Sequence, residues 1–371
     1  MGSRLSLSAL LLLSVPSWGS GFALIERDAA GLGRAYAGQV AVVEAGSLGF
    51  NPAALPQRLT LSASLHGIHN GLQPEDAGVD ALIPAAYGAY RGLGVGIYAP
   101  FGLATDYPHD WSGRRAALYS GIESARFQVA GGVQVSPTVR FGAGIFTQRL
   151  WAKLSKAYPL ALGADDAEVS IEGEGSGFGW SVGGLWTPDP GLSVGLAYAS
   201  HVEHRLRGHA ELPTGRVKSR ADLTTPESLT AGLSWTVRPG WRLLGGVTWT
   251  RWSRLQSLDI ELSNGLALSE VHRWRDTWRL DLGGEFERGA WTWRLGAAWD
   301  QSPIRSSEYR TPRLPDADRV WGTLGVGYQR ADWRIDLGYA HLWFGDRKGT
   351  HLQVKYSGGS QILAVGISRQ W

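Results

Sequence analysis

Large apolar residues alternate with small or polar residues along most of the chain, and segment 361–371 shows the pattern clearly. Leu363, Val365, Ile367 and Trp371 fall on one face of an extended segment, and mostly small or polar residues fall on the other. Successive side chains of a strand point to opposite sides of a sheet, so one side suits lipid and the other a lumen. The pattern predicts that the chain ends in the closing strand of a membrane barrel.

The same alternation recurs from residue 58 onward, in segments of about ten or more residues that turn signals separate. Short turns alternate with longer polar loops, such as 154–168 and 207–215, as periplasmic turns and extracellular loops do. The sequence predicts an all-β fold, a transmembrane antiparallel β-barrel of about 14 strands in residues 57–371, with both termini on the periplasmic side. The expected strands are 59–69, 82–91, 93–103, 124–135, 138–153, 169–187, 192–206, 216–237, 241–262, 268–287, 290–301, 319–329, 332–345 and 360–371.

Charged residues in several of these strands fall opposite the large apolar residues. In segment 290–301, Trp291, Trp293 and Leu295 alternate with Thr292 and Arg294. Charge on the lipid face costs about 2–4 kcal/mol near the bilayer midplane, so these charges should point into the lumen. We interpret them as a network that holds a plug to the wall, and direct contact with a ligand is the alternative. They are Arg279, Asp281, Glu285, Arg294, Arg334 and Asp336.

Two N-terminal stretches do not alternate. Residues 1–19 combine Arg4, a short apolar run and small residues at Ser17 and Gly19, which predicts a signal peptide cleaved after Gly19. Residues 20–56 are small and Gly-rich, and an open segment of this kind cannot cross lipid with unpaired backbone groups. A barrel of this size is wider than the ~8 strands that side chains alone can fill. We expect residues 20–56 to form an N-terminal hatch (plug) in the lumen, and a periplasmic extension is the alternative.

The third expected strand, 93–103, breaks a rule of sheet pairing. Pro100 cannot donate a hydrogen bond to the ladder, and Gly102 tolerates a kink beside Phe101. This combination predicts a local loss of pairing in the wall, through which an apolar solute would leave sideways into lipid. A β-bulge that shapes the barrel is the alternative.

The composition agrees with an exported barrel. Gly supplies 51 of 371 residues, about twice the usual share, and Trp supplies 18. The apolar content of 43% is ordinary, whereas a helical membrane protein would be more apolar. The net charge is +3 without a basic run, so nucleic acid is not expected as a partner. A soluble β-sandwich or propeller is the alternative fold.

The candidate catalytic and metal motifs have simpler explanations. Two G-x-S-x-G matches, 179–183 and 191–195, lie in β-alternating segments, whereas a nucleophile elbow needs a strand-to-helix turn. His201, His204 and His209 have charged neighbours typical of a solvated strand end. The absence of Cys excludes Cys-based metal sites. We expect no enzymatic activity, no cofactor and no metal site.

Several short motifs occur together in the order found in one family, and on them the chain resembles the FadL family of outer-membrane long-chain fatty-acid and hydrocarbon transporters. Together they extend over nearly the whole chain after the signal peptide. They are Gly31–Gly38, Asn51-Pro52-Ala53, Gly102–Asp106, Gly177–Trp180, Leu223–Glu227, Trp249–Ser253, Asp276–Arg279, Asp300–Pro303 and Leu314–Arg319.

The resemblance implies specific site residues. Phe22 would lie at an inner pocket, Lys156 would meet the ligand head group, and Asp300 would be a pocket acid. A second basic position of the fatty-acid members falls at or near Glu270, where Arg275 (or Arg273) would substitute. The family's hatch and lateral gate fall on Asn51, Pro52, Ala53, Pro100, Phe101 and Gly102.

The resemblance implies passive uptake of long-chain fatty acids or other hydrophobic compounds across the outer membrane of a diderm bacterium. Extracellular loops would capture the ligand, an inner pocket near the N-terminal tail would hold it, and the kinked strand would release it laterally. Glu270 and the short loops leave room for a neutral ligand. A diffusion porin or a structural outer-membrane protein is the alternative. The expected partners are fatty acids or aromatic hydrocarbons, outer-membrane lipid, lipopolysaccharide and the barrel-assembly machinery, and we expect a monomer.

Overall fold

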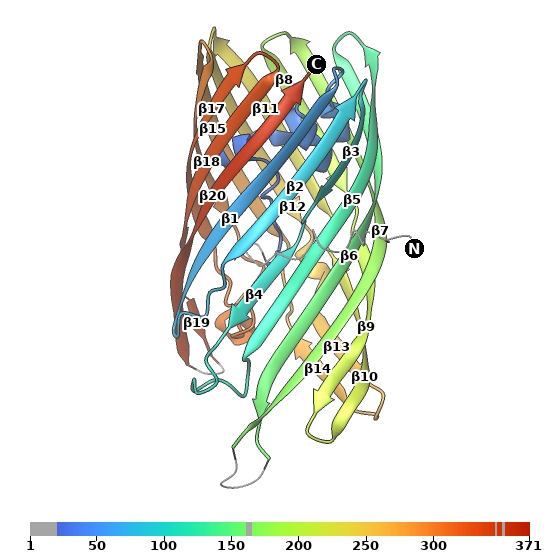
Figure 1. Ribbon diagram of the computed structural model, residues 1–371, viewed down its shortest axis with the longest axis vertical. Coiled ribbons are helices and arrows are strands. Elements are labelled where there is room, and N and C mark those ends of the chain that lie inside the picture. Colours follow the sequence, from blue (N-terminus) through green and yellow to red (C-terminus); the bar gives the residue numbers. More distant parts are fainter. Residues whose placement is uncertain (1–20, 161–164, 346, 351–352) are drawn as a thin grey trace, which may run out of the picture.

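The structure is a computed structural model that describes residues 21–160, 165–345, 347–350 and 353–371. The signal peptide expected in residues 1–19 lies outside this range. The described chain is dominated by one antiparallel sheet that closes on itself, as Figure 1 shows. None of the helices in the described chain is long and apolar enough to span a bilayer.

Closure of the barrel comes from the first and last strands. β1 (Thr60–Gln73) and β20 (Val354–Gln370) pair in antiparallel register, with Thr60 opposite Gln370 and His69 opposite Gln361. Leu363 is 65% exposed on the outer face, and Ile362 beside it is fully buried. The prediction that the C-terminal segment closes a barrel is therefore confirmed.

The barrel has fourteen strands, which confirms the predicted fold class. The continuous strands besides β1 and β20 are β2 (Ala81–Tyr90), β5 (Tyr119–Ser136), β6 (Val139–Tyr158), β7 (Ala167–Asp189), β16 (Trp291–Asp300), β17 (Arg319–Arg330) and β18 (Trp333–Phe344). The interrupted strands are β3 (Leu93–Tyr98) with β4 (Gly102–Asp106), β8 (Leu192–Ala199) with β9 (Val202–Leu212), β10 (Gly215–Thr225) with β11 (Ser228–Arg238), β12 (Trp241–Thr250) with β13 (Ser257–Leu262), and β14 (Ala267–Val271) with β15 (Thr277–Arg288). A short β19 (Arg347–Gly349) pairs with β20.

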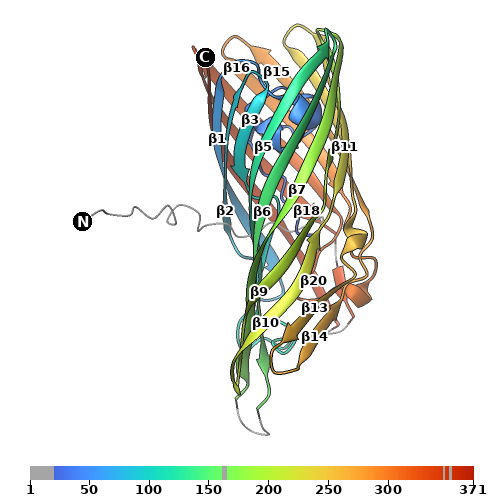
Figure 2. The same cartoon turned by 90° about the vertical axis from the view of Figure 1, so that its right-hand side faces the viewer.

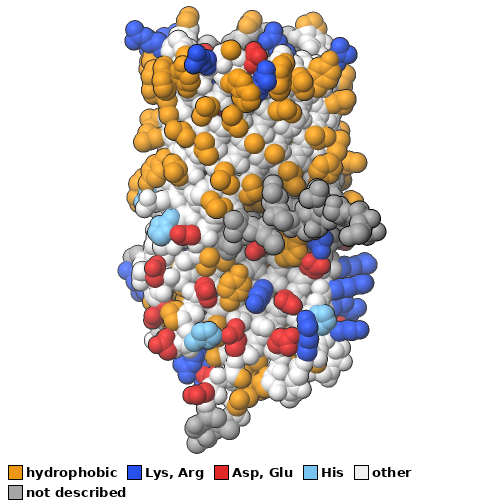
Figure 3. Space-filling view, in the orientation of Figure 1, with side chains coloured by type: hydrophobic (Ala, Val, Ile, Leu, Met, Phe, Trp, Pro, Cys, Tyr) orange, Lys and Arg blue, Asp and Glu red, His pale blue; other side chains and the backbone are white. Residues whose placement is uncertain are grey.

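The outer surface divides into two zones along the barrel axis. Hydrophobic side chains cover the upper half in Figure 3, and charged side chains dominate the lower half. On β16, Trp291 and Leu295 are 46% and 63% exposed, whereas Arg294 between them is 3% exposed. The C-terminus and the short turns lie at the hydrophobic end (Figure 1). This end is the membrane-embedded, periplasmic one, and the charged half projects outward from the cell.

The prediction of a loop at 207–215 was wrong. β9 and β10 form a hairpin there, with Leu212 opposite Gly215 and Arg207 opposite Arg220. This hairpin lies in the charged half of the barrel (Figures 1 and 3), where outward side chains face water. Outward positions of these strands therefore need no apolar residues, and their polar sequence resembles that of a loop.

The described part of the hatch, 21–56, lies inside the lumen towards the periplasmic end (Figures 1 and 2), as the plug interpretation expected. It is built of short helices with little regular structure between them. Small wall residues let its backbone lie against the sheet, since a Cβ on Gly142 would stand 2.3 Å from the Pro52 carbonyl carbon. The helices are α1 (Ala29–Gly33), η2 (Gln39–Ala41), η3 (Ala45–Gly49) and η4 (Pro52–Ala54).

Buried ion pairs tie the hatch to the wall. Arg34 of the hatch donates to Glu285 on β15 at 2.8 Å, and Arg294 on β16 donates to the same carboxylate at 2.9 Å. Arg242 on β12 lies 3.2 Å from it, and Arg294 also pairs with Asp336 at 2.9 Å. The predicted lumenal network between plug and wall is present.

Candidate functional site

The third strand is interrupted where the sequence predicted a kink. Tyr98 at the end of β3 lies opposite Arg126 of β5, and Gly102 at the start of β4 lies opposite Glu123. Residues 99–101 therefore face only residues 124–125, so the kink contains one extra residue, as in a β-bulge.

At this bulge, the side chain of Ser124 takes the place of the backbone hydrogen bonds of the ladder. The Ser124 hydroxyl accepts a hydrogen bond from Phe101 N at 2.9 Å and donates to Phe101 O at 2.6 Å. The serine thereby satisfies both backbone groups of Phe101, which a regular strand would have paired with the backbone of β5.

The other edge of the third strand loses its pairing. The ladder between β2 and β3 runs from Tyr90 opposite Leu93 to Ala86 opposite Ile97 and ends there. In the described chain, no ladder joins segment 81–85 of β2 to β4, and an isolated bridge joins Gly78 to Thr105. The wall therefore has an unpaired stretch beside the kink, so the bulge and the loss of pairing are both present.

The beginning of the hatch occupies this stretch from the inside. Phe22 O accepts a hydrogen bond from Gly102 N, and Leu24 N donates to Pro100 O, each at 2.9 Å. An isolated antiparallel bridge joins Ala23 to Phe101. We call segment 21–24 the N-terminal tail.

A buried acid holds the start of the N-terminal tail. Gly21 N donates to Asp316 at 3.1 Å, and the Ser302 hydroxyl donates to the same carboxylate oxygen at 2.8 Å. Asp316 belongs to the loop between β16 and β17, and burial raises the pKa of its carboxyl group, against the effect of these hydrogen bonds. The tail is thus held at both the kink and an extracellular loop.

Four buried aromatic side chains meet at the tail, and we call them the aromatic cluster. Phe22 lies 5.6 Å from Phe101, 4.8 Å from Trp252 and 5.9 Å from Trp274, measured between ring centroids. Trp252 and Trp274 lie 5.1 Å apart in a T-shaped arrangement. Trp252 belongs to η5 (Trp252–Arg254) and Trp274 to the segment between β14 and β15. Phe22 and Trp274 line an outer cavity and Phe101 lines an inner one, so members of the cluster border both.

The outer cavity lies on the extracellular side of the cluster and is mainly apolar. Phe22 and Trp274 belong to its lining. It shares Leu154, Leu258, Glu270 and Arg313 with a wider cavity of about 250 Å³, so the two are adjacent. Lys156, which sits on the inward side of β6, lines this wider cavity. The other apolar residues of the outer cavity are Leu103, Ile122, Leu223, Leu255 and Leu314.

The charges of the outer cavity are nearly balanced. Arg313 donates to the Ser120 hydroxyl at 3.1 Å, and its Nε lies 3.5 Å from Glu270. Burial lowers the pKa of Arg313, and Glu270 acts in the opposite direction. Sequence reasoning missed Arg313, which comes from the loop that carries Asp316, although its position directly before the recognised motif Leu314–Arg319 was a signal.

Arg275 and Arg273, expected as substitutes, take other positions. Arg275 donates to Ser302 O at 3.1 Å, and Arg273 donates to the Tyr309 hydroxyl at 3.0 Å. Neither belongs to the lining of the outer or the inner cavity.

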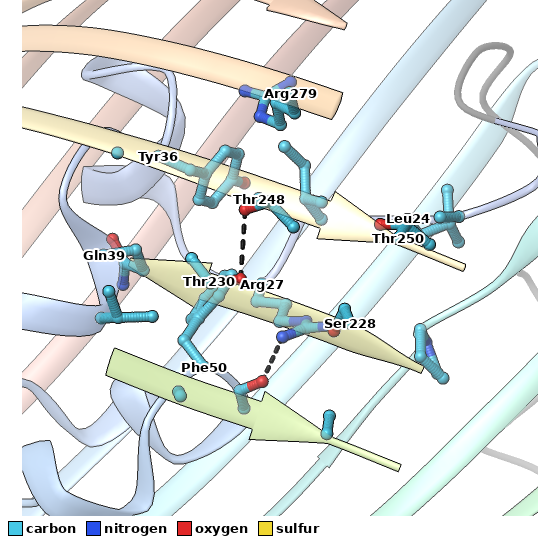
Figure 4. Close-up of a pocket in the computed structure, with 18 of the residues that line it drawn as sticks. Leu24, Arg27, Tyr36, Gln39, Phe50, Ser228, Thr230, Thr248, Thr250 and Arg279 are labelled. Carbon is cyan, nitrogen blue, oxygen red and sulfur yellow. Dashed lines mark hydrogen bonds between the residues drawn. The ribbon is translucent and has the colours of Figure 1, made fainter. Parts of the chain in front are cut away.

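The inner cavity lies between the hatch and the wall strands β8, β11, β12 and β15, and measures about 140 Å³. Figure 4 shows Thr230, Thr248 and Thr250 along its wall side, with Thr230 and Thr248 hydrogen-bonded at 3.1 Å. Asp300 also lines it, paired with Arg319 at 2.6 Å and Arg279 at 3.4 Å. Pro100 and Phe101 of the kink belong to the same lining.

Asn51, Pro52 and Ala53 fasten the end of the hatch. Asn51 Nδ2 donates to Val40 O at 2.7 Å and to Gly184 O of β7 at 3.0 Å, and its Oδ1 accepts from Ala53 N at 2.9 Å. The motif thus caps η4 and joins the hatch to the wall. The described residues contain no cluster of three or more side chains suited to a metal ion.

Comparison with known sequences bears on this arrangement of barrel, hatch and kinked strand. The profile of the family described as "Outer membrane protein transport protein (OMPP1/FadL/TodX)" matches residues 10–370. The chain belongs to this family. It is therefore an outer-membrane transporter of the FadL/TodX type and not an enzyme.

Individual relatives agree along most of their length. The long-chain fatty acid transport protein of Escherichia coli is 26% identical over 402 residues, which cover 90% of this chain and 89% of that protein. The crystal structure of a Pseudomonas aeruginosa FadL homologue has a TM-score of 0.85 at 21% identity, covering 94% of this chain and 99% of the other. The Pseudomonas putida toluene transporter TodX has a TM-score of 0.73 at 16% identity, covering 97% and 100%. The two structures establish the shared fold.

Proposed function

We propose that the chain takes up long-chain fatty acids or other hydrophobic compounds by passive diffusion and releases them laterally at the kink. The supporting observation is the N-terminal tail, which occupies the unpaired stretch beside β4 while its Phe22 belongs to the aromatic cluster that borders both cavities. One short segment therefore lies across both the path through the lumen and the opening in the wall.

The proposed path has three steps. A ligand enters the wide cavity near Lys156 and moves into the outer cavity, where apolar side chains bury its hydrocarbon part. The N-terminal tail then leaves the kink, and the ligand passes Phe22 into the inner cavity. It leaves through the wall between segment 81–85 of β2 and Pro100, and so enters lipid without crossing the polar hatch.

The free energy that holds the tail at the kink is comparable to the free energy that a ligand gains when its hydrocarbon chain is buried. Three hydrogen bonds hold the tail at Pro100, Gly102 and Asp316, and each contributes a net of about 0.5–1.5 kcal/mol. Each buried methylene of a ligand gains about 0.8 kcal/mol. A ligand that buries several methylenes therefore offsets the displacement of the tail, so that opening would depend on the ligand and need no other energy source.

Filling the kink tests the lateral exit. A Cβ on Gly102 would stand 2.8 Å from Leu24 Cδ1, so Gly102→Val should press the tail and kink together and lower uptake of labelled oleate or toluene about tenfold. Gly284→Val is the matched control, because a Cβ there meets nothing closer than Arg242 O at 3.9 Å. Both variants should show the same amount of heat-modifiable folded barrel. Wild-type rates in Gly102→Val would remove the lateral exit from the proposal.

The alternative of an open diffusion porin predicts a different measurement. A plugged lumen should give little ion conductance in planar bilayers, and deletion of residues 21–45 should raise it. An intact protein that already conducts freely would support the porin. The roles of Lys156, Asp300 and Arg275 as ligand contacts stay predictions, as do lipopolysaccharide, the assembly machinery and the monomeric state.

A further inference from the structure

Arg126 is a buried cation with no acidic partner among the described residues. It lies on the inward face of β5 and is 5% exposed, whereas Phe127 beside it is 50% exposed to the outside. Its Nη2 and Nε donate to Gln148 Oε1 at 2.7 and 3.2 Å, and its guanidinium lies 3.8 Å from the centre of the Phe146 ring. No carboxylate of the described residues lies within ion-pair distance of Arg126. A buried charge held only by neutral groups is costly, so such a position calls for another explanation.

Arg27 of the hatch is a second cation without an acidic partner among the described residues, and its side chain is half-buried. Its guanidinium lies 4.4 Å from the centre of the Phe50 ring and 4.7 Å from that of Tyr98, and it donates to Gly49 O. The Nε of Arg27 is buried without a hydrogen-bond partner among the described residues, and these residues offer it no ion pair. Figure 4 shows the Arg27 side chain beside Ser228 and Thr230 in the inner cavity.

The two guanidiniums meet at one aromatic ring next to the kink. Arg126 lies 5.9 Å from the centre of the Tyr98 ring, which Arg27 also contacts. Tyr98 is the last residue of β3, and Pro100 follows two residues later. Both arginines line the inner cavity together with Pro100, so both cations face the space beside the unpaired wall.

The charges around the inner cavity leave a surplus of two positive groups. Its lining contains four arginines and two aspartates, so the difference is 4 − 2 = +2. Asp300 already accepts from Arg319 and Arg279, and Asp281 lies 3.7 Å from Arg279. The surplus therefore belongs to Arg27 and Arg126. In the outer cavity, by contrast, Glu270 lies 3.5 Å from Arg313 and offsets it.

We propose that Arg27 and Arg126 form an inner anion site that receives the carboxylate of a long-chain ligand and holds it beside the lateral opening. This inference rests on the proposed function and adds the ligand class, a single-chain carboxylate. Guanidinium groups bind carboxylates through strong charge-assisted hydrogen bonds, and here the ligand supplies the counter-charge that the protein lacks. The head group is held in the inner cavity while the hydrocarbon chain lies against the apolar side chains around the kink.

A pair of ligands with the same chain and different head groups tests this site. Uptake of labelled palmitate and labelled 1-hexadecanol is measured in cells expressing wild type, Arg126→Gln, Arg27→Gln or the double variant. Palmitate uptake should fall about tenfold in the double variant. Hexadecanol uptake should change less than about twofold, because its neutral hydroxyl makes no charge-assisted hydrogen bond with the two arginines. Equilibrium dialysis of purified protein in non-ionic detergent should show the same selective loss for palmitate binding.

Two further variants separate the charge from the fold. Arg149→Gln is the matched control, since Arg149 is 52% exposed on the outer face and pairs with the exposed Glu174. Arg126→Lys keeps the charge without the planar fork, and palmitate uptake should lie between wild type and Arg126→Gln. Folded barrel is quantified by its heat-modifiable mobility.

The possible outcomes are distinct. Unchanged palmitate uptake in the double variant, or equal losses for palmitate and hexadecanol, would overturn the inner anion site and leave the transport proposal standing. If wild-type cells take up neither ligand faster than cells with empty vector, the transport proposal itself fails and the inner site fails with it.

Discussion

The hatch contacts the wall in two different ways on its two sides. On the side of β15 and β16, Arg34 is joined to Glu285 by a buried ion pair at 2.8 Å, and two further arginines share that carboxylate. On the side of the third strand, the N-terminal tail meets the kink through backbone hydrogen bonds and apolar contacts. The first contact is costly to break, and the second can be exchanged for contacts with a ligand. On the proposed path, the tail would move while the body of the hatch stays in place.

Removing the acid at the centre of the fixed contact should have the largest effect. Glu285→Ala removes the shared partner of Arg34 and Arg294. Because these arginines keep Glu44 and Asp336, the cost should approach but not exceed the value of about 3–5 kcal/mol for a fully broken buried pair. We expect a lower midpoint of thermal unfolding and a leaky pore in planar bilayers. Glu174→Ala, which breaks the exposed pair with Arg149, should cost at most about 1 kcal/mol. Equal thermal stability of the two variants would mean that the hatch is not held by these ion pairs.

Loosening the kink should have a smaller and more local effect. Ser124→Ala removes the acceptor for Phe101 N and the donor to Phe101 O, which costs about 1–3 kcal/mol for a buried backbone group. Hydrogen exchange at residues 99–102 should rise while exchange on β15 and β16 is unchanged. Ser193→Ala is the control, because its hydroxyl meets Thr187 Oγ1 at 3.2 Å away from the kink. Unchanged protection at the kink would show that the bulge does not depend on Ser124.

The barrel and its kink could be predicted from local sequence, because each follows from residues that are adjacent in a single strand. Alternation around Leu363 and Val365 gives the face of the closing strand, and Pro100 gives the interruption. Absence of alternation marked the hatch. The inward position of Arg126 was also implied by its outward neighbours Phe127 and Val129.

The arrangement of the site depends on contacts that local patterns do not encode. Arg27 and Arg126 meet at Tyr98 because the hatch folds back against β3 and β5, a contact between segments far apart in the chain. Whether Arg275 or Arg313 reaches the outer cavity depends on the path of the loop between β16 and β17. The sequence predicts a loop at 207–215, where β9 and β10 in fact continue, because strands in water do not show the apolar face of strands in lipid.

The central claim is that ligands pass only when the N-terminal tail leaves the kink, and a reversible tether tests it directly. Ala23 and Phe101 form an antiparallel bridge, a pairing whose Cα separation of about 4.5–5.5 Å suits a disulfide. The chain contains no Cys, so the double variant Ala23→Cys/Phe101→Cys has no competing thiol. Each single variant serves as the control for loss of the native side chain.

The measurement is uptake of labelled palmitate before and after reduction of the double variant. We predict that the oxidised protein takes up no more ligand than empty vector and that a reducing agent restores the rate of the single variants. Equal uptake by the fully oxidised and the reduced protein would contradict the account, since the ligand would then pass without movement of the tail.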